Sequence, residues 1–220
     1  MAMKQKIYVR PRFRKLEPSE YMDFYNSLRD ARKVNRHGLF VLLRDPEVYK
    51  DGQNFLLGHG VAGFAIKEGE MISVHKNNVK AEQSGVRHIL PKMVRCAFKY
   101  GAYRGDCYGE FLADYYSQNG FVAVAYVPFD YVPDNPVNWD YKQFGKPNDY
   151  VMMRGVRNVA ELDRLSANGG ITTFAEMQPY IKRFTNYEEA LEYRDRLYED
   201  TKRYGYKSRI DIIKSKKDSK

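Results

Sequence analysis

Short apolar runs alternate with turn residues in the first third of the chain, a pattern typical of antiparallel strands. Apolar runs at 54–57, 60–66 and 71–75 are separated by short segments that contain glycine. The spacing predicts three strands joined by tight turns. An earlier apolar run at 39–43, bounded by glycine and by Asp-Pro, predicts a further short strand.

Two stretches carry apolar side chains at steps of three and four residues, which is typical of amphipathic helices. The first predicts a helix over 20–34. The second predicts a helix that begins near Leu90 and ends before Gly101, with Pro91 in its first turn, where the missing N–H costs little. A polar segment at 76–84 joins the strands to this second helix.

The next part of the chain continues the alternation of strands and helices. A strand is expected over 102–108 and a helix over 109–117. The run FVAVAYVPF at 121–129 is almost entirely apolar and fits a central strand that is buried on both faces. After a loop rich in proline and asparagine, a last short strand is expected over 150–153.

The C-terminal part has the capping signals of helices. Asn158, Thr173 and Thr185 each stand three residues before a glutamate, which is the spacing of a capping box. These caps predict three helices, over 159–167, 174–183 and 186–203.

The order of these elements predicts an α/β (α+β) fold with a mixed, mostly antiparallel central sheet flanked by helices. We expect a sheet domain over residues 1–157 and a helical appendage over 158–213. The polar residues 214–220 are expected to form a basic, disordered tail.

The formal charge of +9 is concentrated at the two ends of the chain. Residues 1–15 and residues 201–220 each carry a net charge of +6, so the body between them carries −3. This distribution argues against a basic nucleic-acid cleft through the whole fold. It leaves open a nucleic-acid or protein partner that binds the ends, beside the simpler interpretation that they are solvated tails.

Composition excludes several classes of protein. Aromatic residues make up 15% of the chain, which is incompatible with wholesale disorder. No apolar run approaches the roughly 18–20 residues that cross a bilayer, so no membrane partner is expected. The start lacks the apolar core of a secretory signal, and we expect a cytoplasmic protein. The four histidines and two cysteines have no metal-ligand spacing, so no metal site is expected.

Three segments in succession resemble the GNAT acyltransferase superfamily. GFAIKEGEMISVH at 63–75 resembles its paired central strands, and GVRHILPKMVRCAFKYGAYRGDCY at 85–108 resembles its pyrophosphate-loop helix and the strand that follows. FLADYYSQNGFVAVAYVPF at 111–129 resembles the closing unit, in which a helix ends Tyr-x-x-x-Gly-Phe before a long strand. Those motif positions are Tyr116, Gly120 and Phe121, and the resemblance covers about residues 54–153.

The resemblance implies a GNAT-like fold that binds acetyl-CoA between two central strands that splay apart. Pantetheine would pair with the backbone around Ser73 and Val74. The pyrophosphate would bind at the start of the following helix, a general anion site. The loop residues implied are Gln83, Ser84, Gly85, Val86, Arg87 and His88. The loop departs from the family motif because Arg87 stands where a small residue is usual, and Pro91 removes an amide from the first turn.

The resemblance also suggests catalytic residues. Tyr116 matches the tyrosine that family members often use as the general acid for the CoA thiolate, a role that suits a phenol because it is neutral and can donate a proton at pH 7. The family has no fixed general base. His75 is the first candidate because imidazole titrates near neutral pH, and Glu70 is the second. Packing roles for Tyr116 and His75 are the alternatives.

Two functions from different classes remain open at this stage. The first is an N-acyltransferase that moves an acetyl group from acetyl-CoA to an amine on a small molecule or a protein. The second is a degenerate GNAT-like accessory protein, of a viral or mobile-element type, that binds a protein or nucleic-acid partner. The altered loop favours the second function, whereas the intact strand pair and the Tyr-x-x-x-Gly-Phe unit favour the first.

Overall fold

The computed structural model describes residues 12–133, 140–146, 149–201 and 203–216. In this part of the chain, eight strands form one sheet in the order β1-β2-β3-β4-β5-β7-β6-β8. The strands are β1 (Phe13–Lys15), β2 (Gln53–Leu57), β3 (Ala62–Lys67), β4 (Glu70–Lys76), β5 (Arg104–Tyr108), β6 (Phe121–Val127), β7 (Tyr150–Gly155) and β8 (Lys182–Arg183).

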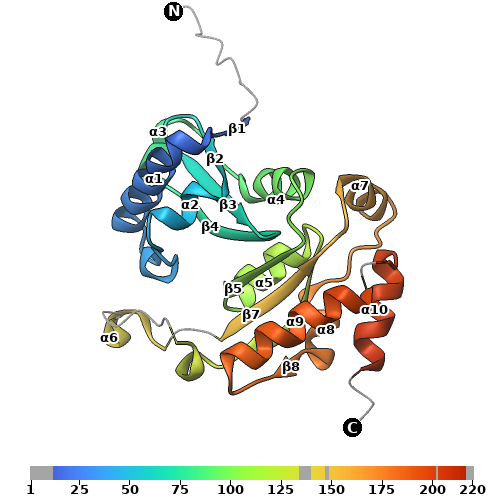
Figure 1. Ribbon diagram of the computed structural model, residues 1–220. Coiled ribbons are helices and arrows are strands. Elements are labelled where there is room, and N and C mark those ends of the chain that lie inside the picture. Colours follow the sequence, from blue (N-terminus) through green and yellow to red (C-terminus); the bar gives the residue numbers. More distant parts are fainter. Residues whose placement is uncertain (1–11, 134–139, 147–148, 202, 217–220) are drawn as a thin grey trace, which may run out of the picture.

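Helices cover both faces of this sheet (Figure 1). They are α1 (Tyr21–Val34), α2 (Glu47–Lys50), α3 (Asn78–Gln83), α4 (Leu90–Lys99), α5 (Glu110–Ser117), α6 (Tyr141–Phe144), α7 (Val159–Ala167), α8 (Phe174–Met177), α9 (Tyr187–Thr201) and α10 (Tyr206–Ser215). The expected fold class, a mixed and mostly antiparallel sheet flanked by helices with further helices at the C-terminus, is confirmed.

Strand pairing follows the sequence pattern closely. β2, β3 and β4 form the expected antiparallel meander, and β7 pairs antiparallel with both β5 and β6. The parallel contacts are β4 with β5, at the middle of the sheet, and β6 with the short β8. The β4–β5 contact therefore joins two largely antiparallel halves.

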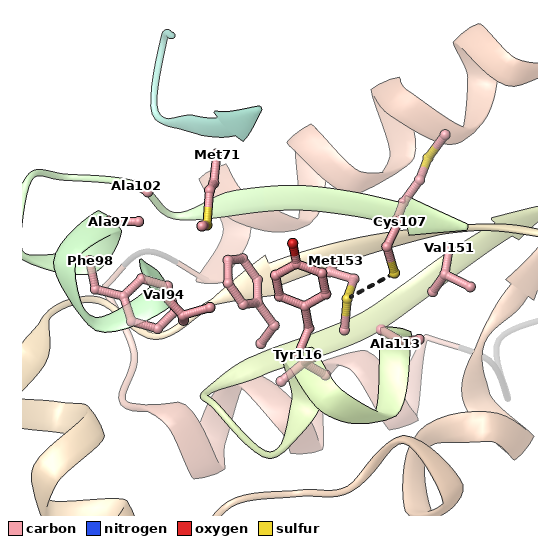
Figure 2. Packing of buried hydrophobic residues seen from close by; sticks show 14 of the residues in the cluster. Met71, Val94, Ala97, Phe98, Ala102, Cys107, Ala113, Tyr116, Val151 and Met153 are labelled. Carbon is pink, nitrogen blue, oxygen red and sulfur yellow. Dashed lines mark hydrogen bonds between the residues drawn. The ribbon is translucent and has the colours of Figure 1, made fainter. Parts of the chain in front are cut away.

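Two hydrophobic clusters hold the layers together. On one face of β2–β4, the buried Phe24, Leu28 and Tyr49 of α1 and α2 pack against Ile72. The larger cluster joins α4, α5 and the second half of the sheet, and its centre includes Met71, Phe98, Tyr116 and Met153 (Figure 2). Side chains of successive residues on a strand point to opposite faces, which is why Met71 and Ile72 belong to different clusters.

The C-terminal helices extend the core of the sheet. Ala190, Tyr193 and Leu197 of α9 and Ile210 of α10 are buried in the same cluster as β6 and β7. In Figure 1, α9 runs alongside β7 and α10 lies beside the end of α9. Residues 158–213 thus cover one part of the sheet, and the site described below includes side chains from α9.

Three local predictions were wrong. Residues 39–43 form a 3₁₀ turn at Gly38–Phe40 and no strand, and Leu39 and Leu42 are exposed. The helix expected over 174–183 ends at Met177, shortly before Pro179. The cap of α9 is Asn186, whose side chain accepts a hydrogen bond from the backbone N–H of Glu189, rather than the preceding threonine.

The basic C-terminal segment is partly engaged in the fold. Arg209 of α10 is buried and donates a hydrogen bond to Glu161, at 3.0 Å, and Lys216 forms an ion pair with Asp200. Residues 1–11 and 217–220, which carry much of the charge assigned to the ends, lie outside the described residues. In the part that is described, no helix combines the length and apolar character needed to cross a membrane.

Candidate functional site

The centre of the sheet opens where β4 and β5 separate. The two parallel strands pair at Glu70 with Arg104 and at Met71 with Gly105, and their pairing ends there although both strands continue. Neighbouring parallel strands normally form evenly spaced backbone hydrogen bonds along their whole common length. The divergence beyond Met71 leaves the facing edges of β4 and β5 open to other groups.

A β-bulge in β4 lies next to this opening. The register between β3 and β4 passes from Gly63 opposite His75 to Ala65 opposite Ile72, so that two residues, Ser73 and Val74, stand opposite one. Ser73 has a φ of 52°, in the left-handed region that non-glycine residues rarely adopt. Its hydroxyl is 2.9 Å from the Tyr49 hydroxyl, a contact that holds the bulge in place. Bulges of this kind re-aim backbone and side-chain groups.

Two cavities lie at this opening and share Val74 in their walls. The first, of about 500 Å³, lies between the end of β4 and the start of α4 and will be called the α4 cavity. The second, of about 490 Å³, lies between β4, β5, the 37–44 segment and α9, and will be called the α9 cavity. Both volumes are within the range of sites for small ligands and cofactors.

Arg87, His88, Ile89 and Leu90, at the start of α4, line the α4 cavity. The helix begins at Leu90 with Pro91 in its first turn, as expected. Among the described residues, no acceptor is found for the backbone amides of Arg87, His88 and Ile89. These amides add to the positive end of the helix dipole, which makes this a place that attracts anions.

The predicted loop residues lie along one short exposed segment. Val86 is half-buried and packs against the core, while the other five are exposed: Gln83, Ser84, Gly85, Arg87 and His88. Arg87 and His88 line the α4 cavity, together with Lys76 from β4. The Arg87 side chain is therefore an exposed part of the wall of the α4 cavity. A side chain at Gly85 would meet no atom within 4 Å, so the loop is open on that side.

Tyr116 on α5 lies in the same buried cluster as α4. It is 7% exposed, packs edge-on against Phe121 and lines the α9 cavity. Figure 2 shows it among the buried side chains of the larger cluster. Burial, with smaller contributions from Cys107 and Asp106, raises the pKa of Tyr116 well above its ordinary value. The phenol therefore keeps its proton at neutral pH, and burial also makes it a weaker acid than a free tyrosine.

His75 is held on the α1 side of β4, with both ring nitrogens engaged. Its Nε2 is 2.9 Å from the Ser27 hydroxyl and its Nδ1 is 3.0 Å from the carbonyl oxygen of Ser73. The ring is also edge-on to Phe24, and burial lowers the pKa of His75 to about 4. This geometry favours a structural role for His75, which anchors α1 to the bulge.

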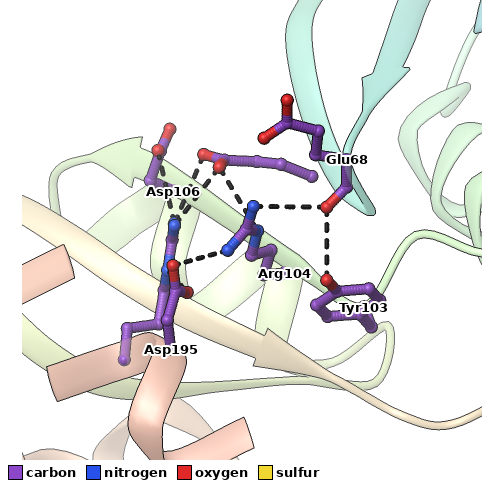
Figure 3. Close-up of polar contacts among 7 residues, drawn as sticks. Glu68, Tyr103, Arg104, Asp106 and Asp195 are labelled. Carbon is purple, nitrogen blue, oxygen red and sulfur yellow. Dashed lines mark hydrogen bonds and ion pairs between the residues drawn. The ribbon is translucent and has the colours of Figure 1, made fainter. Parts of the chain in front are cut away.

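Glu70 lines the α9 cavity and belongs to a network of charged groups, of which Figure 3 labels Arg104, Asp106 and Asp195. Arg194 of α9, which is 1% exposed, donates to both carboxylate oxygens of Glu70, at 3.3 and 3.2 Å. Arg104 lies 3.5 Å from the same carboxylate and also pairs with Asp195. Burial opposes ionisation of Glu70, but the charge of Arg194, hydrogen bonds with Asp106 and Arg194, and the charge of Arg104 outweigh it and hold the Glu70 pKa below its ordinary value.

Asp106 of β5 is a member of this network that sequence reasoning missed. Its carboxylate is 3.8 Å from Arg194 and its side chain is 18% exposed, toward the α9 cavity. Burial, and then the negative charge of Glu70, raise the pKa of Asp106 to about 7. Two signals were in the sequence: charged residues within the strand predicted over 102–108, and Arg194 on the apolar face of the last predicted helix.

The structure thus brings together Glu70, Ser73, Val74 and Tyr116 at the α9 cavity, whereas only Arg87 and His88 of the predicted loop residues line the α4 cavity. His75 also lines the α4 cavity, but its ring nitrogens are engaged by Ser27 and by the carbonyl oxygen of Ser73. Among the described residues, no group of three or more histidine, cysteine, aspartate or glutamate side chains is arranged to bind a metal ion. The chemistry available at the site is that of carboxylates, a phenol and backbone amides.

Comparisons with known proteins give little further information. No protein-family model matches the chain, and no curated protein matches it. Among solved structures, the fold is similar to the solution structure of apo-form YjaB from Escherichia coli, with 11% sequence identity and a TM-score of 0.38. That likeness covers 67% of this chain and 99% of the other. A likeness at this score contributes nothing to the assignment of function.

Proposed function

We propose that the protein is a GNAT-like N-acyltransferase that transfers an acetyl group from acetyl-CoA to an amine. The observation that carries this proposal is the separation of β4 and β5 just beyond Met71, next to the bulge at Ser73 and Val74. A cavity lies on each side of Val74, so two substrates could approach the same point from opposite directions. A reaction between two bound molecules requires this arrangement.

The α4 cavity suits the cofactor. Acetyl-CoA carries a diphosphate, and the amides of Arg87, His88 and Ile89 at the start of α4 would receive it, assisted by the cationic side chains of Arg87 and Lys76. Pantetheine would lie along the open edge of β4. Beyond Met71, the backbone groups on this edge do not pair with β5. The thioester would then reach the bulge.

The α9 cavity suits the acceptor amine. Its nitrogen would attack the thioester carbonyl, whose developing negative charge would be stabilised by backbone amides at the bulge. Tyr116 would give its proton to the departing thiolate, because Tyr116 lines this cavity and its phenol stays protonated at neutral pH. The products would be an N-acetylated amine and free CoA.

The direct test is to incubate the protein with acetyl-CoA and a mixture of primary amines and to follow the release of free thiol. The proposal expects thiol release above the rate of spontaneous hydrolysis and an acetylated amine in the mass spectrum. If acetyl-CoA stabilises the protein but no amine is ever acetylated, the alternative of a degenerate binding protein is favoured. If acetyl-CoA neither binds nor reacts, the proposal is wrong.

A further inference from the structure

Arg44 lines the α9 cavity without a counter-ion. The guanidiniums and carboxylates in the wall of this cavity are those of Arg44, Arg104, Arg194, Glu70, Asp106 and Asp195. All of these except Arg44 belong to one continuous network of ion pairs. The half-buried Arg44 side chain has no hydrogen bond or ion pair with any described residue. Since a guanidinium is always charged and can hold a carboxylate through two parallel hydrogen bonds, Arg44 is free to bind an anionic group of a ligand.

Arg44 lies close to the bulge in β4. Burial raises the pKa of the Tyr49 phenol, while Ser73 and then the backbone and the charge of Arg44 act to lower it, so Arg44 is a near neighbour of the Tyr49 hydroxyl. That hydroxyl is 2.9 Å from the Ser73 hydroxyl at the bulge. The unpaired guanidinium therefore belongs to a residue beside the place where the acetyl group would be transferred.

The segment that carries Arg44 is held firmly against α1. A Cβ at Gly38 would lie 2.1 Å from the carbonyl oxygen of Arg32, so only glycine permits this approach. Nε of Arg32 also donates a hydrogen bond to the carbonyl oxygen of Gly38, at 3.2 Å. Leu39 and Leu42 of the same segment line the α9 cavity with Arg44. One anchored segment thus supplies a cation and part of an apolar wall, the combination that orients a small ligand.

Aromatic rings form another part of the wall. Phe40 and Tyr108 lie with ring centroids 4.8 Å apart, and Tyr150 packs edge-on against Tyr108 at the same distance. All three residues line the α9 cavity. A phenyl group on a ligand would pack well against these rings.

We propose that Arg44 binds a carboxylate of the acceptor, and that the acceptor is an amino acid or a similar molecule with an apolar or aromatic side chain. This inference rests on the proposed acetyl transfer and names the substrate class for it. Such an acceptor carries one ammonium and one carboxylate and has no net charge. It therefore suits a cavity whose wall holds guanidiniums and carboxylates in equal number.

The carboxylate site can be tested without acetyl transfer. N-acetylphenylalanine and N-phenethylacetamide share a phenyl ring and an amide, and only the first has a carboxylate. Calorimetric titration of the wild-type protein with each compound measures what the carboxylate contributes. We expect N-acetylphenylalanine to bind about tenfold more tightly or better, which is the scale of a hydrogen bond to a charged group. Equal affinities, tighter binding of N-phenethylacetamide, or binding of neither compound overturns the inference.

Variants assign the preference to Arg44. In Arg44→Gln the two compounds should bind with nearly equal affinity, whereas Arg44→Lys, which keeps the charge without the paired donors, should keep part of the preference. The matched control is Arg29→Gln, at an exposed arginine of α1 that lines neither cavity, and it should keep the whole preference. A full preference in Arg44→Gln overturns the inference. The comparison in wild type stands even if Arg44→Gln does not fold.

Turnover separates this inference from the proposed function. With acetyl-CoA, kcat/KM for phenylalanine should exceed that for phenethylamine about tenfold or more, chiefly through a lower KM, because Arg44 would bind a part of the acceptor that does not react. If phenethylamine is acetylated at least as well as phenylalanine, the inference is overturned while acetyl transfer stands. If N-acetylphenylalanine binds through Arg44 but acetyl-CoA neither binds nor reacts, the proposed function is wrong while the carboxylate site stands.

Discussion

Arg194 donates hydrogen bonds to both carboxylate oxygens of Glu70, although the two residues are 124 positions apart in the chain. The contact fastens α9 to the central strand β4, and it is made by an arginine that is 1% exposed. A buried ion pair of this kind costs much desolvation and is held in place by further partners. Here the further partners are Asp106 and Asp195. The helix α9, which covers the sheet, therefore also contributes charged groups to the lining of the α9 cavity.

Removing this arginine should destabilise the protein strongly. In Arg194→Met, Glu70 and Asp106 would lose their buried counter-charge, and we expect the free energy of unfolding to fall by about 3 kcal/mol. The matched control is Arg196→Met on the exposed side of the same helix, for which a change within about 0.5 kcal/mol is expected. Urea denaturation of the three proteins measures both values. Equal stabilities would contradict the role given to Arg194.

Tyr116→Phe tests the general acid. The substitution removes only the hydroxyl, so the edge-on packing against Phe121 should remain. We expect kcat for acetyl transfer to fall about a hundredfold while the dissociation constant of acetyl-CoA changes little. Tyr204→Phe, at an exposed tyrosine of the C-terminal region, serves as the control. An unchanged kcat in Tyr116→Phe would remove Tyr116 from the mechanism.

The burial of His75 should appear in the pH dependence of stability. Its pKa is about 4 in the folded protein against 6.5 as the ordinary value, so between these pH values the unfolded chain binds a proton that the folded protein does not. This contribution to stability is complete above about pH 6.5 and is lost as the pH falls toward 4. The stability of wild type relative to His75→Gln should therefore decrease by about 2 to 3 kcal/mol between pH 7 and pH 4. A difference that stays constant with pH would refute this assignment.

Gly63 should be sensitive to the smallest side chain. A Cβ there would lie 2.6 Å from His75 Cε1 and 2.8 Å from the carbonyl oxygen of Phe55, and both atoms are held in the sheet. We expect Gly63→Ala to lower the free energy of unfolding by about 1 to 3 kcal/mol. At Gly52 the nearest atom would be 3.5 Å away, so Gly52→Ala is a control that should be nearly neutral. Thermal denaturation of both variants decides between these outcomes.

Local patterns in the sequence were sufficient for most of the fold. The meander, the start of α4 at Leu90 with Pro91 in its first turn, and the caps at Asn158 and Thr173 were all predicted and are present. Each of these rests on residues within a few positions of one another. The run at 39–43 was misread because its apolar side chains line a cavity and form no strand.

The site could be predicted only in part because its members come from distant segments. Tyr116 and Glu70 were named from the sequence and do line the same cavity. Asp106 was missed because its environment depends on the register of β5 against β4 and on a helix almost ninety residues later. His75 was named because imidazole titrates near neutral pH, but its direction is set by the bulge, which turns it toward Ser27.

The central claim is that the start of α4 and the open edge of β4 bind acetyl-CoA, and calorimetric titration of the protein with acetyl-CoA tests it most directly. We expect saturable binding of one molecule per chain, weakened about tenfold or more in Arg87→Glu, because Arg87 lines the α4 cavity. Lys99→Glu, with the same change of charge at the other end of α4, should bind as wild type does. No heat of binding and no thermal stabilisation at about 1 mM acetyl-CoA would contradict the claim, because a ligand that binds the folded state must stabilise it.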